Sequence, residues 1–580
     1  MTQALKLLNI LLITIIPLGF LNTIQSPFAG GKFIIFQFIL GIFLTCFAIE
    51  IFDKKQIPFY KPQNSKLFNC SILTLALCLI YTLFSQTPVI SLFGSINRFM
   101  GMYTYSLIFL VFFLNIFFIP NTSKKGIQKT LLKSLIITAN IAALYGIFQY
   151  FGVEFFFAKF NSNHFHGRIF SLSGNPSFFG QFLALSGLST FFYNKKHWYY
   201  KASFILQFSA LILTSTRASF IAFILGLILL NIKTVKKHFK KYLILIAIVS
   251  SIFVASNFKQ ITSLNSLQSR SHIWSSTIEL IKQKPLGYGL ENIETFFPLT
   301  QTPEFNIYED NIYKTVDKIH NQPLSILYSA GIIGFLTFLY FIFLICQNWF
   351  QETSPQKKLV YTLVIVNLIQ NLLNFFDLTT LLILAILLSL QISTKTKSKI
   401  NYPKSLTLTF LTLGLIIIQN GSTYTNGLYQ YRQYKQLFYT NYAQSQNHLA
   451  QALNYLPNQI NLWLELGYSN LDQRLKTYEQ LYRLQSPMPH PQIWLAKAIE
   501  DTQPQLANNI FTSVHEKNPQ NPIWLLELLL HQQKTNNPQY PQTLKLFKEM
   551  FKTIWEPPFS HKDLTFIKNF PQYEKLKNTQ

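Results

Sequence analysis

Charged side chains are scarce in this sequence, whereas apolar and aromatic side chains are abundant. Only 12% of the 580 residues are charged, against roughly 25% in an ordinary soluble protein. Hydrophobic residues make up 49% of the chain and aromatic residues 16%, and the mean hydropathy is +0.23. This composition excludes a protein that is soluble over its whole length. Much of the chain must lie in lipid.

Cysteine and acidic residues are also few. The four cysteines all lie inside apolar segments, which excludes a disulfide framework and a thiolate metal site: Cys46, Cys70, Cys78 and Cys346. Asp and Glu number 23 against 49 Lys and Arg, so the formal net charge is +26. In a soluble protein this excess would indicate nucleic-acid binding. Here the lysines lie in short loops between apolar runs, where membrane topology explains them better, so we expect no nucleic-acid partner.

Long apolar runs recur along the first 420 residues. A membrane-spanning helix needs about 20 mostly apolar residues, and that rule gives about thirteen candidates. They begin near residues 4, 31, 67, 101, 130, 176, 201, 217, 241, 323, 358, 378 and 405. The first run, about Leu7 to Leu21, has no clear cleavage motif and precedes further spans, so we interpret it as a retained helix rather than a signal peptide. The predicted fold is an all-α, polytopic membrane helix bundle of about 12–13 spans.

Lysine is concentrated in alternate loops between these runs. The lysine-rich loops contain Lys54, Lys55 and Lys61; Lys124, Lys125 and Lys129; Lys195, Lys196 and Lys201; Lys233, Lys236, Lys237, Lys240 and Lys241; Lys357 and Lys358; and Lys395, Lys397, Lys399 and Lys404. Cytoplasmic loops carry an excess of Lys and Arg, so the alternation predicts a cytoplasmic N-terminus. It also predicts that a large loop, about 255–322, lies outside and that the chain after about residue 419 is exported.

The last part of the chain, residues 421–580, has a soluble and helical pattern. Three tryptophans follow prolines at a spacing near 30 residues: Trp463, Trp494 and Trp524. This period, together with a W-x-x-L-G run, resembles a degenerate tetratricopeptide array, whose concave surface holds a peptide, a partner or a glycan. The alternative is a small irregular helical cap. We therefore predict a transmembrane domain at 1–420 and an exported helical domain at 421–580.

Arginine is almost absent from the membrane-spanning part, and where it occurs it falls on the predicted outer face. The first 420 residues contain four arginines, and His320 falls on the same face: Arg98, Arg168, Arg217 and Arg270. A planar guanidinium binds phosphate oxygens through two parallel hydrogen bonds, which lysine cannot do. Ionisable groups near membrane depth are costly and usually mark function. The pattern predicts an enzyme that handles a lipid-linked phosphate or pyrophosphate.

These residues also have structural interpretations. Arg98, at a helix end, is equally typical of an interfacial anchor that reaches the lipid headgroups. Arg217 fits that role less well, because it lies in a tight turn among Ser and Thr residues, on the side where positive charge is disfavoured. His320 has the alternative role of capping the tenth span.

Two groups would suit a metal by residue type. The pair His164 and His166 lies in a loop, and three acidic residues lie near His320: Glu309, Asp310 and Asp317. The spacing of the acidic residues matches no specific metal-binding pattern. We interpret the pair, like His272, as ordinary loop histidines and predict no metal site.

Several short motifs follow one another in a fixed order on the predicted outer face. They are R-x-x-x-W, P-L-x-G-x-G, H-N-x-x-L and an apolar helix with G-I-I-G, here Arg270 and Trp274; Pro285, Leu286, Gly287 and Gly289; His320, Asn321 and Leu324; Gly331 and Gly334. In this order they resemble the O-antigen ligase and O-antigen polymerase superfamily. The turn at Arg217 and the G-N-P entry at Asn175 also look like that family, so the resemblance covers most of residues 90–390. One departure is Ser329, where relatives often carry glutamate.

The resemblance implies a reaction and a division of labour. Members of the superfamily take a glycan from a polyprenyl pyrophosphate carrier and transfer it to an acceptor hydroxyl on the outer side of the bacterial inner membrane. On this basis Arg217 and Arg270 bind the pyrophosphate, and Arg168 is a third ligand. His320 takes the proton of the acceptor. The supporting residues are Arg98, Asn175, Trp274 and Asn321, and the resemblance implies neither a metal nor a cofactor.

The acceptor stays open at this point. A ligase, a repeat-unit polymerase and a protein O-oligosaccharyltransferase share this pattern and differ in whether the acceptor is a lipid, a growing glycan or a protein. A transporter for lipid-linked sugars is a different class, but it would place its charges near the membrane midplane in broken helices. A structural scaffold that presents the repeat domain leaves the outer arginines unexplained.

Overall fold

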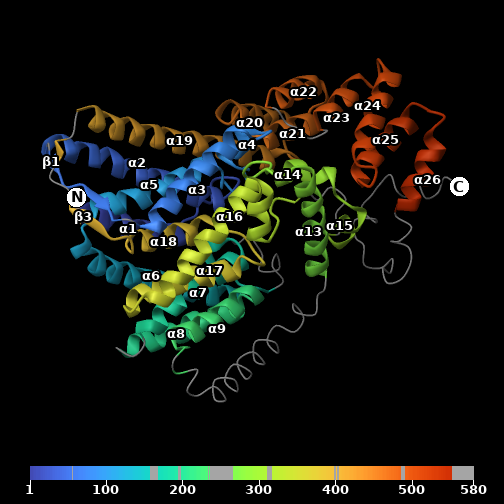
Figure 1. Cartoon of the computed structure of the whole chain (residues 1–580). Helices are drawn as coiled ribbons and strands as arrows, with labels where there is room; N and C mark the ends of the chain where they lie inside the picture. The colour runs from blue at the N-terminus through green and yellow to red at the C-terminus, as the bar shows by residue number, and fades with distance from the viewer. Residues whose placement is uncertain are drawn as a thin grey trace.

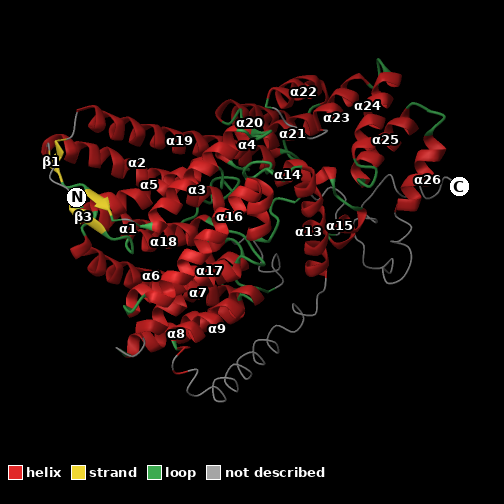
Figure 2. Ribbon diagram, in the orientation of Figure 1, coloured by secondary structure: helices red, strands yellow, loops and turns green. Residues whose placement is uncertain are grey.

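The structure is a computed structural model, and it describes residues 1–54, 56–63, 65–156, 167–193, 197–232, 234, 265–309, 316–396, 400–401, 404–484 and 490–550. Helices make up nearly all of the described secondary structure (Figure 1, Figure 2). The described strands are short: β1 (Gln56–Ile57), β2 (Tyr60–Pro62), β3 (Thr394–Thr396) and β4 (Ile400–Asn401). The predicted all-α class is confirmed.

Apolar helices occupy the places where the sequence predicts membrane spans. The predicted start near 241 lies outside the described residues, the one at 101 lies one residue before a helix, and the others fall within helices. These helices are α1 (Thr2–Leu18), α2 (Ala29–Lys54), α3 (Lys66–Leu83), α5 (Met102–Phe118), α6 (Asn121–Tyr150), α7 (Pro176–Tyr193), α8 (Trp198–Leu213), α9 (Arg217–Leu230), α16 (Gln322–Gln351), α17 (Pro355–Gln370), α18 (Leu378–Ser389) and α19 (Lys404–Leu437). Among the described helices, α2, α3, α6, α16 and α19 are long and apolar enough to cross a membrane. α1, α5, α9 and α18 are shorter apolar helices.

Several of the lysine-rich loops lie together at one end of the helices. β1 pairs with β4 and β2 with β3, both antiparallel, so two of these loops run side by side, with Lys61 opposite Lys395. The Lys124 Nζ, in the first turn of α6, donates to the Ile392 carbonyl at 2.6 Å. Loops far apart in the sequence therefore meet at the same end of the bundle, as the lysine alternation requires.

The predicted outer groups lie at the other end. Phe117, in the last turn of α5, stacks on Phe59 beside β2 with ring centroids 5.0 Å apart, whereas Arg98 precedes the first turn of α5. The described part of the predicted large loop contains α13 (Asn265–Gln283), α14 (Ile293–Phe296), η3 (Phe297–Leu299) and α15 (Pro303–Tyr308). In Figure 1 these helices lie away from β1 and β3, beside the C-terminal helices.

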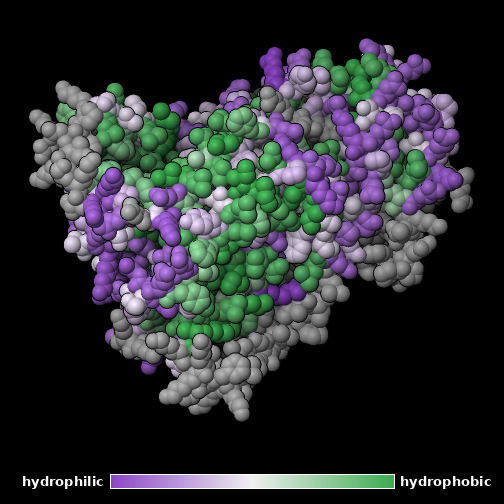
Figure 3. Space-filling model, in the orientation of Figure 1, coloured by the Kyte–Doolittle hydropathy of each residue, from purple (hydrophilic) through white to green (hydrophobic). Residues whose placement is uncertain are grey.

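An apolar band crosses the molecule between hydrophilic surfaces (Figure 3). Exposed apolar side chains project from α3 and α16, among them Ile72, Leu79, Ile333 and Phe343. A continuous apolar surface of this kind is unusual in a soluble monomer and is the normal exterior of a protein in lipid. The chain is a multi-pass membrane protein. Which end faces the cytoplasm stays a prediction.

The C-terminal part is a succession of helices that begins with α19. This helix runs without a break through the predicted domain boundary near 420 and packs along α2 (Figure 1). It is followed by α20 (Tyr442–Tyr455), α21 (Ile460–Ser469), η4 (Leu471–Gln473), α22 (Arg474–Arg483), α23 (His490–Ile499), α24 (Pro504–Lys517), α25 (Pro522–Lys534) and α26 (Tyr540–Met550). Trp463, Trp494 and Trp524 lie on α21, α23 and α25, so their spacing corresponds to one helix pair. The tetratricopeptide interpretation and the two-domain division stay predictions.

Candidate active site

α13 carries two of the predicted site residues and ties two loops together. Arg270 lies about one turn before Trp274, and its Nη1 donates to the Leu373 carbonyl at 3.1 Å. The Trp274 indole N–H donates to the Ile319 carbonyl at 2.9 Å. α13 therefore holds both the loop before α18 and the segment before α16, where His320 lies.

The turn between α8 and α9 holds Arg168. The Arg168 Nε donates to the Thr214 carbonyl at 2.9 Å, and its Nη2 donates to the Thr216 hydroxyl at 3.2 Å. The turn is tight, because Ser215 has a φ of +53° and α9 begins at Arg217 directly after Thr216. Arg168 is thereby fixed beside the first turn of the helix that starts with Arg217.

Arg168, Arg217 and Arg270 lie close enough to influence one another. Burial, and then the charges of Arg270 and Arg217, lower the pKa of Arg168 to about 10. Burial and the charge of Arg217 also lower the pKa of Arg270, although Glu309 acts in the opposite direction. Like charges held together in a half-buried place repel one another, and a bound anion would relieve that repulsion. The structure thus brings together the three arginines that the sequence predicts as pyrophosphate ligands.

His320 is half-buried close to Arg270 of this cluster, and its lowered pKa keeps it neutral at physiological pH. Its pKa is lowered to about 4, by burial first and then by the charge of Arg270, while Asp317 acts in the opposite direction. The ring lies edge-on against Phe375, with centroids 5.3 Å apart. Within the described part of the chain, the buried Nδ1 has no hydrogen-bond partner. The backbone φ is +56°, which is rare for a residue other than glycine and is typical of strained functional positions.

Asn321 caps α16. Its Oδ1 accepts a hydrogen bond from the Leu324 N–H at 2.9 Å. An asparagine in this position satisfies an N–H group that a helix start leaves open. The structure therefore gives the capping role, considered above for His320, to its neighbour, and the imidazole is left for another purpose.

Arg98 contacts the segment before α16 and the loop before α18. Its Nε donates to the Asp317 Oδ2 at 2.7 Å, and its Nη2 lies 2.5 Å from that oxygen. The guanidinium carbon lies 5.1 Å from the centre of the Phe375 ring and 5.7 Å from that of Phe178. Arg98 is thus paired inside the protein, and Asp317, one of the acidic residues near His320, is its counter-ion. The pair fixes the short segment that ends at His320.

The P-L-x-G-x-G motif forms backbone hydrogen bonds with a kinked turn of α16, and we call this contact the glycine clasp. Gly331 interrupts the helix with φ +56° and ψ −165°. The N–H groups of Tyr288 and Gly289 donate to the Tyr328 and Ser329 carbonyls, at 3.0 and 2.9 Å. A side chain on the first glycine of the motif would come within 2.6 Å of the Ser329 carbonyl oxygen. The glycines are therefore needed for close backbone approach, and Ser329 contributes its carbonyl to the clasp.

A protein-family model described as O-antigen ligase matches residues 202–339. The match covers 138 of the 580 residues, so the likeness to O-antigen ligases is shown for that part of the chain. The matched residues contain Arg217, Arg270, His320 and the glycine clasp, whereas Arg98 and Arg168 lie outside them. No curated protein matches the chain. The match confirms the predicted superfamily and supports, at that level, a membrane glycosyltransferase of the O-antigen ligase and polymerase family.

The segment 371–377 follows α17, outside the matched residues, and its role could not be predicted from the sequence. Its Phe375 packs against both Arg98 and His320, and its Leu373 carbonyl accepts from Arg270. Its Asp377 caps α18 by accepting the N–H groups of the two following threonines, at 2.9 and 3.2 Å. The only signal in the sequence was a cluster of polar residues in an otherwise apolar stretch.

Two lysines at the end of the helices that carries Arg98 are buried. Lys318 forms an ion pair with Glu291, and both side chains are only 9% exposed. The Lys32 Nζ donates to three backbone carbonyls at 2.8, 2.9 and 3.1 Å. These two lysines make hydrogen bonds and an ion pair inside the protein. We therefore do not count them with the exposed loop lysines from which the membrane orientation is predicted.

The remaining predicted groups are less informative. Asn175 accepts a hydrogen bond from the Ser177 N–H at 2.8 Å and lines a cavity of about 340 Å³ that also contains Arg98. Within the described residues, no group of three His, Cys, Asp or Glu side chains is arranged to hold a metal. Glu309 accepts a hydrogen bond from Ser269. Three of the candidate metal ligands lie outside the described residues: His164, His166 and Asp310.

Proposed function

We propose that this protein transfers a glycan from a polyprenyl pyrophosphate carrier to an acceptor hydroxyl on the outer face of the bacterial inner membrane. The observation that carries the proposal is the gathering of Arg168, Arg217 and Arg270, with the half-buried His320 close to Arg270. These four residues come from four separate segments of the chain. The O-antigen ligase match supports the same class of reaction.

The arginine cluster fits the leaving group. As the bond between the anomeric carbon and the pyrophosphate oxygen breaks, the electron pair stays on that oxygen, where negative charge grows. The guanidiniums offer paired N–H groups to the phosphate oxygens. Because the cluster is already assembled in the free protein, little reorganisation accompanies the reaction. Charge stabilisation of this preorganised kind is usually the largest catalytic contribution.

His320 fits the role of the base. The acceptor hydroxyl gives its proton to the imidazole while its oxygen bonds to the anomeric carbon. A histidine with a pKa of about 4 is neutral at physiological pH but is a weak base. A bound pyrophosphate offsets the positive charge of Arg270, so donor binding should raise the pKa of His320. The base would then become effective when the donor is in place.

An apolar pocket beside the site fits the carrier lipid. It has a volume of about 290 Å³ and lies between α3, α5, α16, α17 and α18. Leu67, Phe109 and Phe338 are among the apolar side chains that line it. The lining also includes Lys318 and Gln322, which lie on either side of His320 in the sequence. An apolar chain in this pocket would have its polar end near the histidine.

A reconstitution experiment tests the proposal. Membranes of source cells that lack this protein contain both the donor and the acceptor. Adding the purified full chain should move glycan from the carrier to the acceptor and release polyprenyl pyrophosphate in equal amount. Glycan transfer without pyrophosphate release, or no transfer at all, would contradict the proposal.

The same cells distinguish the possible acceptors. If the protein is a ligase, its loss leaves long glycan chains on the carrier. If it is a repeat-unit polymerase, its loss leaves single repeat units there. If it is a protein O-oligosaccharyltransferase, its loss removes glycan from envelope proteins.

A further inference from the structure

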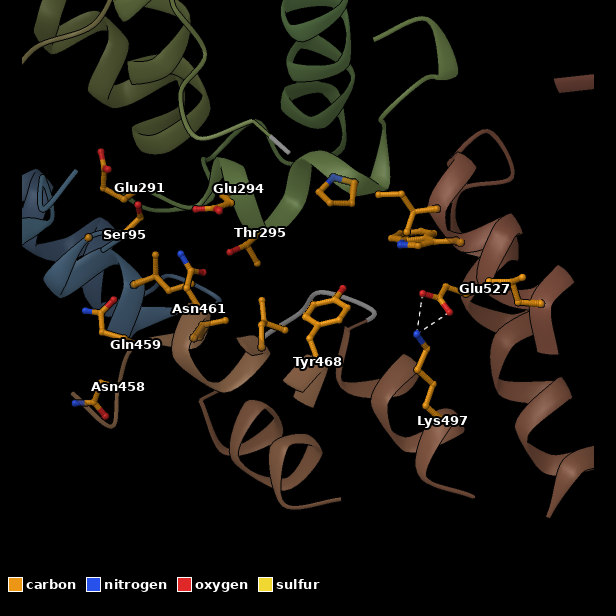
Figure 4. Close-up of a pocket in the computed structure, with 18 residues that line it drawn as sticks. Ser95, Glu291, Glu294, Thr295, Asn458, Gln459, Asn461, Tyr468, Lys497 and Glu527 are labelled. Carbon is orange, nitrogen blue, oxygen red and sulfur yellow. Dashed lines mark hydrogen bonds and ion pairs between the residues drawn. The ribbon is translucent and has the colours of Figure 1, made fainter. Parts of the chain in front are cut away.

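A cavity of about 610 Å³ lies between the matched O-antigen ligase residues and the C-terminal helices (Figure 4). One wall is built by α14 and the turn before it, together with the end of α4 (Pro88–Phe93). The facing wall is built by α21, α23 and α25. Figure 4 shows Glu294 and Thr295 on the first wall opposite Asn461 and Tyr468 on the second. The volume lies within the range of about 300–1,000 Å³ that is usual for small-molecule sites.

The two walls are fixed to each other by buried contacts. The Asn518 side-chain amide donates to the Pro298 carbonyl at 2.9 Å and to the Gln301 carbonyl at 3.0 Å. The Asn521 side-chain amide also donates to the Pro298 carbonyl, at 2.9 Å. Leu299 packs against the apolar cluster of α23, α24 and α25. These buried side-chain amides on one wall donate to backbone carbonyls of the other wall, and this pairing fixes how the two walls dock. The cavity between them therefore has a defined shape.

The charges of the cavity do not suit an anion. Lys497 is paired with Glu527 at 2.8 Å, and Glu291 is paired with Lys318. Glu294 makes no hydrogen bond or ion pair within the described residues. The cavity therefore offers carboxylate and amide groups, and its lysine is already neutralised. A pyrophosphate or an acidic glycan would find no unpaired cation among the described lining residues, whereas a neutral ligand rich in hydroxyl donors would find acceptors there.

The polar groups and the aromatic ring suit a saccharide. Sugar hydroxyls donate to carboxylate and amide oxygens such as those of Glu294 and Asn461, and the apolar face of a sugar ring packs on an aromatic side chain. Tyr468 is 55% exposed, and Figure 4 shows its ring directed into the cavity. Peptides are usually bound by an exposed strand edge or an apolar helix groove. The described walls are helices and turns on which carboxylate and amide groups are interspersed with apolar and aromatic side chains, and this mixture favours a saccharide over a peptide.

One wall of the cavity is continuous with the segment that carries the predicted base. Glu291 pairs with Lys318, which lies two residues before His320. Burial raises the pKa of Glu294 to about 7, and the nearby charge of Asp317 acts in the same direction. A ligand held on this wall therefore lies close to the segment that positions His320.

We propose that this cavity binds the acceptor as a neutral saccharide, through sugar residues next to the one whose hydroxyl reacts. The assignment rests on the proposed function, because it is transfer that makes the bound saccharide an acceptor. The arginine cluster takes the anionic donor and the C-terminal helices take the neutral acceptor. The charge of each site therefore selects the substrate that binds there.

Binding of saccharides to the full chain in lipid nanodiscs tests the inference. The probes are oligosaccharides released by mild acid from the lipid-linked glycans of the source cells and, separately, from their envelope glycans. The variants are Tyr468→Ala and Asn461→Ala. The matched control is Tyr482→Ala, because Tyr482 is a tyrosine of the same C-terminal helices, is 71% exposed and does not line the cavity.

At least one probe should bind the unmodified protein, and Tyr468→Ala should weaken that binding about tenfold. Asn461→Ala should weaken it about fivefold, through the loss of one hydrogen bond. Tyr482→Ala should bind like the unmodified protein, and all three variants should bind the lipid-linked donor normally. The inference is overturned if neither probe binds, if the cavity variants bind normally, or if envelope peptides rather than saccharides depend on Tyr468.

The outcomes separate the inference from the proposed function. If the unmodified protein transfers glycan from the carrier but the saccharide results are negative, only the cavity assignment fails. If saccharides bind as expected but the protein releases no polyprenyl pyrophosphate from the donor, the proposed function fails.

Discussion

The two ends of the membrane helices carry positive charge in different ways. At one end Lys61, Lys125 and Lys395 are exposed to solvent. At the other end Arg168 and Arg270 are half-buried, donate to backbone carbonyls and have lowered pKa values. The lysines keep their hydration, so they can orient the chain at little energetic expense. The arginines are held in an unfavourable arrangement that a bound anion would relieve.

The comparison shows that the type and the burial of a basic residue carry different information. An exposed lysine on a loop determines which side of the membrane that loop occupies. A half-buried guanidinium that is held by carbonyl groups is preorganised for a ligand. Lys32 and Lys318 are a third case, because they are buried and saturated by carbonyls or by a carboxylate. Counting positive charges would not separate these three roles.

The most direct way to break the comparison is to show that both ends face the same compartment. Alkaline phosphatase, which is active only after export, is fused after Lys61 in one truncation and after Tyr439, which follows α19, in another. We expect an all-or-none difference, with activity only in the second fusion, because the lysine-rich end should stay in the cytoplasm. Activity measurements in whole cells read the result. Activity of the Lys61 fusion alone would reverse the orientation and place the arginine cluster inside.

The next largest effect is expected at His320. His320→Ala should bind the lipid-linked donor but lose about 100- to 10,000-fold in transfer rate, the usual contribution of a general base. Donor binding and the transfer rate are measured separately on the reconstituted protein. His272→Ala is the matched control, because His272 lies on α13 but outside the cluster, and it should transfer normally. Loss of donor binding in His320→Ala would make the imidazole a pyrophosphate ligand instead of the base.

Exchanging the type of basic residue sharpens the comparison between the two ends. Arg217→Lys and Arg270→Lys keep the charge but lose the paired hydrogen bonds to phosphate oxygens. Two lost charge-assisted bonds should cost about 2–4 kcal/mol, or about 30- to 1000-fold in rate. The reverse exchange at the other end, Lys125→Arg, should change nothing. The transfer rate of each variant is measured at equal membrane content. Near-normal rates in both lysine variants would indicate that the arginines serve only as interfacial anchors.

The sequence predicted those features of the fold and site that residue type alone determines. Hydropathy located the helices, lysine alternation grouped the loops, and the rarity of arginine identified Arg168, Arg217 and Arg270 as one set. The structure places these three together, but their role in binding pyrophosphate stays a prediction. The predicted start of α6 was nine residues late, because Lys124, Lys125 and Lys129 lie in the first turns of the helix and not in a loop.

The rest of the site depends on contacts between distant segments. Arg98 and its partner Asp317 are 219 positions apart in the sequence. Phe375 matters only because the loop before α18 brings it against His320, which lies 55 positions earlier in the sequence. The cavity at the C-terminal helices arises from docking that single-sequence patterns do not encode. Such features follow from the three-dimensional packing and could not be read from composition or spacing.

The pH dependence of the transfer rate reports how far burial and the neighbouring arginines lower the pKa of His320. Since the pKa of His320 is lowered to about 4, the neutral and active form should persist well below pH 6.5. Between pH 7 and pH 5, kcat/KM should fall by less than about twofold, whereas an unperturbed histidine would lose about 25-fold. In the same titration kcat should fall at a higher pH than kcat/KM, because the bound pyrophosphate raises the pKa. A limb near pH 6.5 in kcat/KM would show that neither burial nor the neighbouring cations lower the pKa of the imidazole.

The smallest effect is expected in thermal stability, and it distinguishes the helix cap, Asn321, from the proposed base, His320. Asn321→Ala removes the side-chain oxygen that accepts the Leu324 N–H, so the free energy of unfolding should fall by about 1 kcal/mol. In a chain of this size the thermal midpoint in detergent should then fall by no more than about 2–4 °C. His320→Ala should leave the midpoint nearly unchanged, because it removes a buried polar nitrogen without a partner in the described chain, while alanine keeps the Cβ and with it the strain of the positive φ. Asn321→Asp, which can still cap the helix, should recover the midpoint. If His320→Ala lowers the midpoint more than Asn321→Ala does, His320 rather than Asn321 stabilises the start of α16. The loss of transfer in His320→Ala would then be a consequence of instability rather than of a missing base.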